Sequence, residues 1–291
     1  MNTKNVSAVI APASPHFVGD GFRVHNFIPG NPQLPMQRMD PFIMLDYNSK
    51  YNFPAAPEPR GVGVHPHRGF ETVTIAYKGR VEHHDSAGGG GVIGEGDVQW
   101  MTAASGVLHK EHHEKEWAKT GGEFQMVQLW VNLPAKDKMS APKYQAIENS
   151  QMVQIAADKD GYIELIAGQY KGATGPAGTF TPIHMMNARL KRGGKSSFDF
   201  PANYTTLALA IEGEILINGS DKVAGDHLAL FDNKGTAFGI EASEDAVVLI
   251  LSGLPVAEPI FAHGPFVMNN RDEIVQAFED YNNGKFGYLE D

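Results

Sequence analysis

The chain has 291 residues, of which 42% are hydrophobic and 20% are charged, so it can bury a full core and is unlike a disordered chain. Its formal net charge of −10 disfavours direct binding to nucleic acid, because an acidic surface repels phosphate backbones. The sequence contains no cysteine, which excludes disulfides, thiolate metal sites and cysteine nucleophiles. Apolar runs stay short of the ~20 residues that cross a membrane, and the first residues do not resemble a signal peptide. We therefore expect a cytoplasmic protein without a membrane partner.

Most apolar segments alternate with period two or are short runs bounded by Gly, Pro, Asn or Asp, and both patterns favour β-strands. The 32 glycines and 18 prolines suit the many turns of an all-β protein. In chain order, the clearest predicted strands are 72–77, 124–133, 206–211, 214–219 and 246–253.

One segment near the end of the chain has a different pattern. Asn270 suits a helix N-cap, acidic residues follow it in the first turn, and Gly284 suits a stop. Between them Ile274, Phe278 and Tyr281 would share one helix face. The segment is predicted to be a short terminal helix.

The two halves of the chain resemble each other. "TVTIAYKGRVEHHDS" is similar to "TLALAIEGEILINGS", which aligns Gly79 with Gly213, and "GEGDVQWM" is similar to "VAGDHLALF", which aligns Gly96 with Gly225. Two copies of one β-unit predict two β-barrels. We expect the joint within 132–145, and therefore a first barrel at 1–137 and a second barrel at 138–291.

Two histidines stand two residues apart in "GVGVHPHRGFET", and a carboxylate follows them. Side chains at i and i+2 of a strand share a face, so His65, His67 and Glu71 would point the same way on one regular strand. A second pair with this spacing, His109 and Glu111, follows a Gly-Asp turn. If these strands line one barrel mouth, three imidazoles and a carboxylate converge, and such a set binds a divalent transition metal. The spacing leaves Glu71 and Glu111 as competing carboxylate ligands.

The second copy of the repeat has lost these residues. Alignment of the two halves places Asp199, Pro201 and Thr205 at the positions of the first histidine pair and its carboxylate, and Phe238 and Ile240 at those of the second pair. We therefore expect the second barrel to keep the fold without the metal.

Other polar clusters favour ordinary surface structure. The glycines at 88–91 lack a following Gly-Lys-Ser/Thr, so a hairpin loop is favoured over a phosphate-binding loop. The segment 83–85, His-His-Asp, stands at the end of a strand and is predicted at the surface. His112 and His113 are predicted on a solvated loop, beside a run of charged residues.

Five motifs carry a family resemblance: "HPHRGFET", "GDVQWMTA", "GVLHKE", "QLWVNLP" and "HGPFVMN". They span nearly the whole chain, and in this order they resemble the pirin family of the cupin superfamily. The resemblance implies a bicupin, in which two β-barrels pack face to face with iron in the N-terminal barrel and none in the C-terminal one. We therefore expect an all-β bicupin with a short C-terminal helix.

In that family the ligands are the two histidines of HPH and the His and Glu of a G-x-x-H-x-E segment. The resemblance thus implies one divalent transition metal per chain, Fe(II) ahead of Mn, Ni, Cu or Zn, held by His65, His67, His109 and Glu111. It leaves Glu71 on the barrel wall or behind the ligands. The chain departs from the family at Lys110, where many pirins have a small residue, and this lysine would alter the charge at the mouth of the site.

The resemblance also implies two kinds of function. Several family members are quercetin 2,3-dioxygenases, which open the heterocycle of a flavonol with O₂, and there Glu111 would also be the general base for the 3-hydroxyl proton. The alternative is a non-enzymatic, iron-dependent regulatory protein that binds a transcription factor or a metabolic enzyme. We favour the enzyme, acting as a monomer on a small aromatic substrate. A pocket open to a flavonol would support it, and a closed metal site under a flat exposed patch would support the regulator.

Overall fold

The computed structural model describes residues 2–291, and they form two compact units. The unit that we call the first barrel contains Ala13–Asn149 and Val256–Asp291. The second barrel contains Ser150–Pro255 and the described residues up to Pro12. This grouping differs from the expected division between residues 137 and 138. The beginning of the described chain belongs to the second barrel, and Val256–Asp291 belongs to the first. The expected all-β fold with a short C-terminal helix is confirmed.

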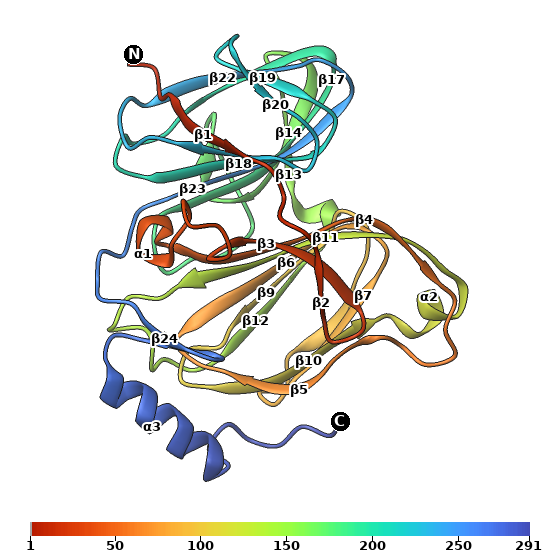
Figure 1. The fold of residues 1–291 in the computed structure, drawn as a ribbon, viewed down its shortest axis with the longest axis vertical. Helices are drawn as coiled ribbons and strands as arrows, with labels where there is room; N and C mark the ends of the chain where they lie inside the picture. Colours follow the sequence, from red (N-terminus) through yellow and green to blue (C-terminus); the bar gives the residue numbers. More distant parts are fainter. Residues whose placement is uncertain (1) are drawn as a thin grey trace. The chain divides into compact units, whose positions relative to one another are not determined.

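The first barrel is built from antiparallel sheets (Figure 1). A seven-stranded sheet has the order β12-β9-β6-β11-β4-β3-β2, a four-stranded sheet has the order β5-β10-β7-β8, and β24 pairs with β25. The bounds are β2 (His16–Val18), β3 (Phe22–Ile28), β4 (Phe42–Pro54), β5 (Gly61–His67), β6 (Phe70–Lys78), β7 (Val81–Asp85), β8 (Gly90–Ile93), β9 (Val98–Thr102), β10 (Val107–His113), β11 (Gly121–Asn132), β12 (Lys143–Ile147), β24 (Phe261–His263) and β25 (Phe266–Met268).

The second barrel is built mainly from one large sheet. Its strand path is β1-β21-β18-β23-β17-β22-β19-β20, with β14 added to β17 and β13 to β14, while β15 and β16 pair separately. The bounds are β1 (Val6–Ile10), β13 (Val153–Ala156), β14 (Lys159–Ala167), β15 (Gln169–Tyr170), β16 (Ala173–Thr174), β17 (Ile183–Asp199), β18 (Thr205–Glu212), β19 (Ile215–Ile217), β20 (Asp221–Val223), β21 (Leu228–Phe231), β22 (Ala237–Ala242) and β23 (Ala246–Gly253).

Helices make a small part of the described chain. They are α1 (Met36–Met39), α2 (Lys115–Thr120), α3 (Arg271–Asn282) and the 3₁₀ turn η1 (Asn149–Gln151). The predicted terminal helix is confirmed as α3, and the Asn270 side chain caps it by accepting a hydrogen bond from the Glu273 backbone N–H at 2.9 Å. Among the described residues, every helix is too short or too polar to cross a membrane.

The end of the chain packs beside the turn that follows the HPH motif. The Arg68 guanidinium donates to Asp280 of α3 at 2.9 Å, with both side chains almost fully buried, and it lies over the Phe286 ring at 4.7 Å. At Gly69 the backbone has φ +90°, and a Cβ atom there would lie 1.9 Å from the carbonyl oxygen of Val267. Only glycine fits this close approach, so the turn requires the residue found in the motif.

The segment 132–145, which we expected to be the joint, packs into the first barrel. Lys138 is 1% exposed, and its ammonium donates to the carbonyl oxygens of Gly69 and Val267 and to the Asn132 side chain at 2.7, 3.0 and 2.8 Å. Burial lowers the pKa of Lys138 to about 8. Beyond it, β12 joins the edge of the seven-stranded sheet.

Candidate metal centre

Three histidines converge on the inner face of the four-stranded sheet. Strands β5 and β10 pair antiparallel, with His65 opposite His109. His67 lies two residues along β5 and shares the face of His65, because side chains alternate along a strand. The ring centroids lie 4.8 Å apart for His65 and His67, 4.2 Å for His65 and His109, and 4.7 Å for His67 and His109. The structure thus brings together the three histidines selected from the sequence.

Glu111 lies near His109, two residues further along β10. Its Oε1 accepts a hydrogen bond from Gln99 Nε2 at 2.5 Å, and Thr74 Oγ1 lies 3.2 Å from the same oxygen. Atoms that could bind a metal form two overlapping groups of three, each within 4.8 Å: one joins His65, His67 and His109, and the other joins His83, His109 and Glu111. His109 therefore links the histidine pair of β5 to the carboxylate.

Glu71 does not share the face of the histidines, and the expectation that it would is wrong. The turn at Gly69 ends β5, and Glu71 belongs to β6 in the other sheet. Thr74, three residues along β6, points to Glu111, so Glu71 points to the opposite face. There it accepts a hydrogen bond from Thr102 Oγ1 at 2.7 Å, and burial raises its pKa to about 7.

His83 is buried in the site, and the prediction that it lies at the surface is wrong. It belongs to β7, opposite Glu111 of β10, and is fully inaccessible to solvent. Its Nδ1 lies 3.4 Å from His109 Nδ1, its Nε2 lies 3.3 Å from Asp85 Oδ2, and its ring stacks on Tyr144. The alternation in "VEHHD" could have indicated the buried position of His83, because Val81, His83 and Asp85 share the inner face while their neighbours point outward.

Asp85 is held as a carboxylate at the end of β7. Burial raises its pKa, but hydrogen bonds from His83 and from the backbone N–H groups of Gly89 and Ala87 lower the pKa below its usual value on balance. Both N–H groups donate to Oδ1 at 2.9 Å, in the hairpin turn that the glycine run was predicted to form.

His113 is also buried, contrary to the predicted solvated loop. Strand β10 continues to His113, which packs against Phe53 and Phe124 and whose Nε2 lies 2.8 Å from the Gly21 carbonyl oxygen. His112 points outward and is half-buried. The apolar packing makes His113 part of the core beneath the site rather than part of the site.

The chemistry of the cluster suits a metal ion. Burial, followed by the repulsion of neighbouring imidazolium groups, lowers the pKa of His67 and His109 well below the usual value for histidine. Neutral imidazole is the form that binds metals. His109 Nε2 is buried without a hydrogen-bond partner, and the His65 and His67 rings lie 4.2 and 4.7 Å from the His109 ring, so the cluster holds an imidazole nitrogen that no protein group occupies. Imidazole nitrogens with a carboxylate are a donor set for a divalent transition metal.

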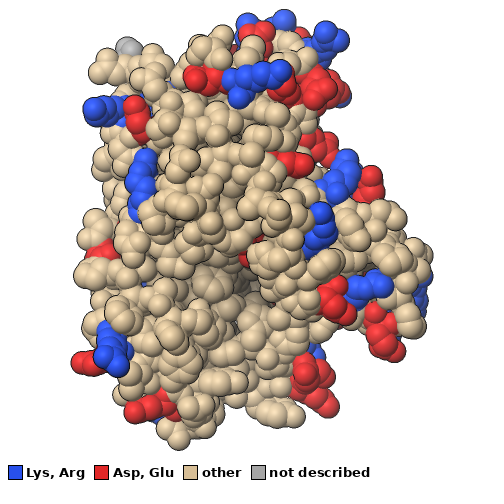
Figure 2. Space-filling model, in the orientation of Figure 1, with Lys and Arg blue, Asp and Glu red and all other residues tan. Residues whose placement is uncertain are grey.

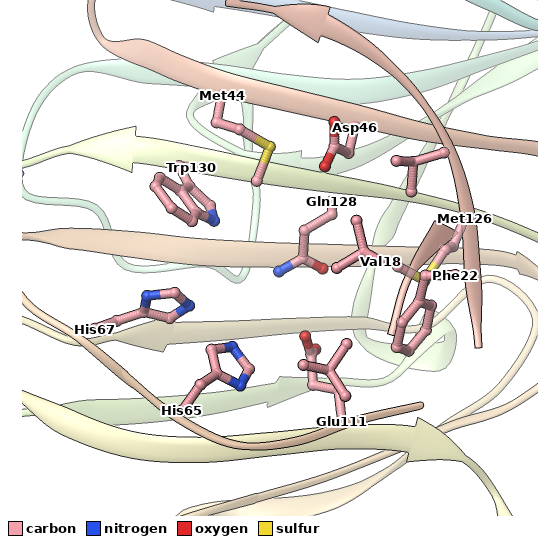
Figure 3. A pocket seen from close by; sticks show the side chains of 12 residues that line it. Val18, Phe22, Met44, Asp46, His65, His67, Glu111, Met126, Gln128 and Trp130 are labelled. Carbon is pink, nitrogen blue, oxygen red and sulfur yellow. The ribbon is translucent and has the colours of Figure 1, made fainter. Parts of the chain in front are cut away.

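A cavity of about 350 Å³ opens onto His65, His67 and Glu111. Figure 3 shows His65, His67 and Glu111 on one wall, Gln128 and Asp46 across from them, and Trp130 and Phe22 toward opposite ends. Most of the remaining lining is apolar, from Val18, Val24, Met44, Val62 and Met126. Figure 2 shows a hollow in this part of the surface, surrounded mainly by uncharged residues. The site is therefore open to a small ligand rather than closed beneath a flat patch.

Two polar groups stand on the wall opposite the histidines. Asp46 of β4 accepts a hydrogen bond from Asn26 Nδ2 at 2.6 Å, and burial raises its pKa. Gln128 of β11 accepts one from Thr74 Oγ1 at 2.6 Å. Since Thr74 also lies within hydrogen-bonding distance of Glu111, this wall is connected to the candidate metal ligands.

Lys110, the departure noted in the sequence, points away from the cluster. Its ammonium donates to the carbonyl oxygen of Glu290 at 2.7 Å, and Asp291 Oδ1 accepts from the Val64 backbone N–H at 3.1 Å. The lysine therefore holds the end of the chain against the outer side of β5 and β10.

Two family models match the chain, one described as Pirin over residues 21–131 and one as the Pirin C-terminal cupin domain over residues 185–287. The chain belongs to the pirin family. A protein of Pseudomonas aeruginosa, provisionally named a quercetin 2,3-dioxygenase, is 46% identical over 97% of this chain and 98% of its own length. A pirin-like protein of Solanum lycopersicum is 37% identical over 93% of this chain and 89% of its own. The crystal structure of quercetin 2,3-dioxygenase from Acinetobacter baumannii has TM-score 0.92 and 46% identity, covering 99% of each chain.

The second barrel of this pirin carries phenyl rings where the first carries imidazoles. On β17 and β22, Phe198 lies opposite Phe238, as His65 lies opposite His109. Phe200 then takes the place of His67, so the alignment of the halves is wrong by one residue in proposing Asp199 and Pro201 there. All three phenylalanines are buried in the core of the second barrel, together with Ile240, which takes the place of Glu111.

Proposed function

We propose that this pirin is a metal-dependent dioxygenase that opens the heterocycle of a flavonol such as quercetin with O₂. The observation that carries the proposal is the apolar cavity that ends on two histidines and a carboxylate. Its volume lies in the range of small-molecule sites, about 300–1,000 Å³. The flat ring of Trp130 and the flexible side chains of Met44 and Met126 would cover a planar aromatic ligand.

We propose His65, His67, His109 and Glu111 as the residues that hold the metal, with Fe(II) as the first candidate. When bound, a divalent transition metal supplies a Lewis acid beside the substrate. The neutral imidazoles and the carboxylate are the donors that such an ion prefers. The similarity to quercetin 2,3-dioxygenase from Acinetobacter baumannii supports the reaction type.

Glu111 is proposed to take the proton of the flavonol 3-hydroxyl group. Its carboxylate lines the cavity, and its Oε1 accepts a hydrogen bond from Gln99. This donor orients the carboxylate, as a general base requires for alignment with the proton that it removes. The apolar walls would exclude water from the reacting ring.

Across the cavity, Asp46 and Gln128 are proposed to position the substrate. Each presents a side-chain oxygen on an otherwise apolar wall, and a phenolic hydroxyl group could donate to it. Contact at both ends of the ligand would hold it in one orientation between the walls.

Turnover of quercetin tests the proposal. Metal-free protein is reloaded with Fe(II) without oxygen, air is admitted, and quercetin loss and O₂ uptake are followed for wild type and His65→Ala. We expect matched consumption of both reactants by wild type, and background rates for the variant. Background rates in wild type with metal bound would contradict the enzyme and favour the alternative, an iron-dependent regulatory protein.

A further inference from the structure

Behind His109, on the side away from the cavity, three buried side chains form one hydrogen-bonded row. His109 Nδ1 lies 3.4 Å from His83 Nδ1, and His83 Nε2 lies 3.3 Å from Asp85 Oδ2. The exposed fractions of the two histidines are 1% and 0%, so water does not compete for these contacts. The row ends at the other carboxylate oxygen, Oδ1, where the backbone N–H groups of Ala87 and Gly89 donate.

The direction of each hydrogen bond follows from the donors available. An ionised carboxylate only accepts, so the contact with Asp85 places the His83 proton on Nε2. In a neutral imidazole the other nitrogen is then an acceptor, so His83 Nδ1 accepts from His109. The proton of His109 is therefore on Nδ1, and its Nε2 keeps a free lone pair. That nitrogen is the one that is buried without a partner.

We propose that His83 and Asp85 are positioning residues that fix the tautomer and ring orientation of His109 for metal binding. The proposal rests on the metal site of the proposed function but not on its reaction. Residues behind metal-binding histidines commonly act in this way, and their loss typically weakens metal binding ~10–100-fold. The His83 ring is itself held by stacking on Tyr144, with ring centroids 5.0 Å apart and planes 16° apart.

The second barrel offers an internal comparison. Across β7 and β10, His83 is paired with Glu111, and across β19 and β22 the corresponding pair is Ile217 with Ile240. Where the candidate ligands are replaced by apolar residues, the positioning histidine is replaced as well. A histidine needed only to complete the barrel wall would have no reason to change together with the ligands.

Metal titrations of the full-length, metal-free chain test the proposal, with Ni(II) as an air-stable probe and a competing chelator. His83→Phe keeps a ring to stack on Tyr144 and removes both nitrogens, and Asp85→Asn removes the fixed acceptor. We expect ~10–100-fold weaker binding in both. The matched control is His84→Gln, because His84 is the exposed neighbour that pairs with Glu82, and its affinity should stay within about twofold.

A second measurement separates positioning from simple structural support. The ¹⁵N shifts of the His109 ring in the metal-free chain should show a protonated Nδ1 in wild type and a mixture of tautomers in Asp85→Asn. Protonation of Nε2 in wild type, or wild-type affinity in both variants, would overturn the proposal. Loss of binding in His83→Phe as complete as in His109→Ala, with Asp85→Asn unaffected, would instead make His83 a direct ligand. None of these readouts depends on turnover of quercetin.

Discussion

The two barrels of this chain use the same strand positions in opposite ways. His65 opposite His109 in the first barrel corresponds to Phe198 opposite Phe238 in the second. In the first barrel His65 borders a cavity, and in the second the phenyl rings pack with one another and with Phe231. The barrel thus folds with either set of rings, so the histidines are not required by the fold itself. This is what a site added to a scaffold looks like.

The strongest way to break this comparison is to remove a ring from each barrel and count metal. His109→Ala removes one of four proposed ligands, and we expect its affinity to fall by more than the ~10–100-fold typical of residues behind a ligand. Phe238→Leu, the matched change in the second barrel, should leave one metal per chain. Elemental analysis after dialysis measures both, and stoichiometric metal retained by His109→Ala would contradict the assignment.

For the free energy of unfolding we expect the larger loss from the change in the second barrel. Phe238→Ala empties part of a packed core and should cost ~3–5 kcal/mol of unfolding free energy. His65→Ala removes a partly exposed ring at the edge of a cavity, and in the metal-free chain it should cost less than ~1 kcal/mol. Urea unfolding of both metal-free variants tests the pair. Equal losses would mean that the histidines also support the first barrel.

A third comparison concerns the buried carboxylate of β6, because the repeat aligns Glu71 with Thr205 in the second barrel. Burial raises the pKa of Glu71 from 4.5 to about 7, so between these values the folded chain holds a proton that the unfolded chain has released. Stability contributed by the protonated group is therefore lost as the pH rises from about 4.5 to 7.

Glu71→Gln should remove this pH dependence. The variant imitates the neutral acid and keeps an acceptor for Thr102, so above pH 7 it should be more stable than wild type by up to about 3 kcal/mol. Urea midpoints at pH 5 and pH 8 measure the effect in metal-free protein. Metal affinity should not change, since Glu71 faces away from Glu111. Loss of metal in Glu71→Gln would contradict the placement of Glu71 on the face of β6 that points away from Glu111.

The smallest expected effect concerns ligand recognition in the cavity. Asp46→Val removes the proposed acceptor, while Asn26 keeps its second hydrogen bond, to the Ile28 carbonyl oxygen at 3.1 Å. One lost hydrogen bond should weaken binding of a flavonol with ring hydroxyl groups by ~10-fold. A flavonol without those groups should bind both proteins alike. Quenching of tryptophan fluorescence in the metal-free chain measures each affinity, and equal weakening for both ligands would exclude a role in hydroxyl recognition.

The sequence predicts the strands, the terminal helix and the clustered histidines because each depends on local pattern. Alternation places His65 beside His67, and a capping residue with acidic neighbours marks α3. These patterns do not depend on how the strands pair, so they can be recognised from the sequence alone.

What the sequence leaves undetermined depends on contacts between distant segments. The turn at Gly69 places Glu71 in another sheet than the histidines. This turn depends on the close approach of Gly69 to Val267, which the motif alone does not reveal. His83 resembles a surface residue until β10 lies beside β7. The alignment of the two halves is shifted by one residue here, so it pairs His65 with Asp199 and misses its true counterpart, Phe198. Register between strands is thus the information that local pattern lacks.

The ion pair between Arg68 and Asp280 has a consequence for how the protein is made. Its partners are 212 residues apart in the chain, yet Arg68 adjoins the HPH motif. On the ribosome, the histidine pair therefore emerges long before α3, and the whole of Ser150–Pro255 is synthesised in between. The turn at Gly69 therefore has its native neighbours, Val267 and Asp280, only after those residues have been synthesised. A chain released before these residues would present the histidine pair beside a turn that lacks both contacts.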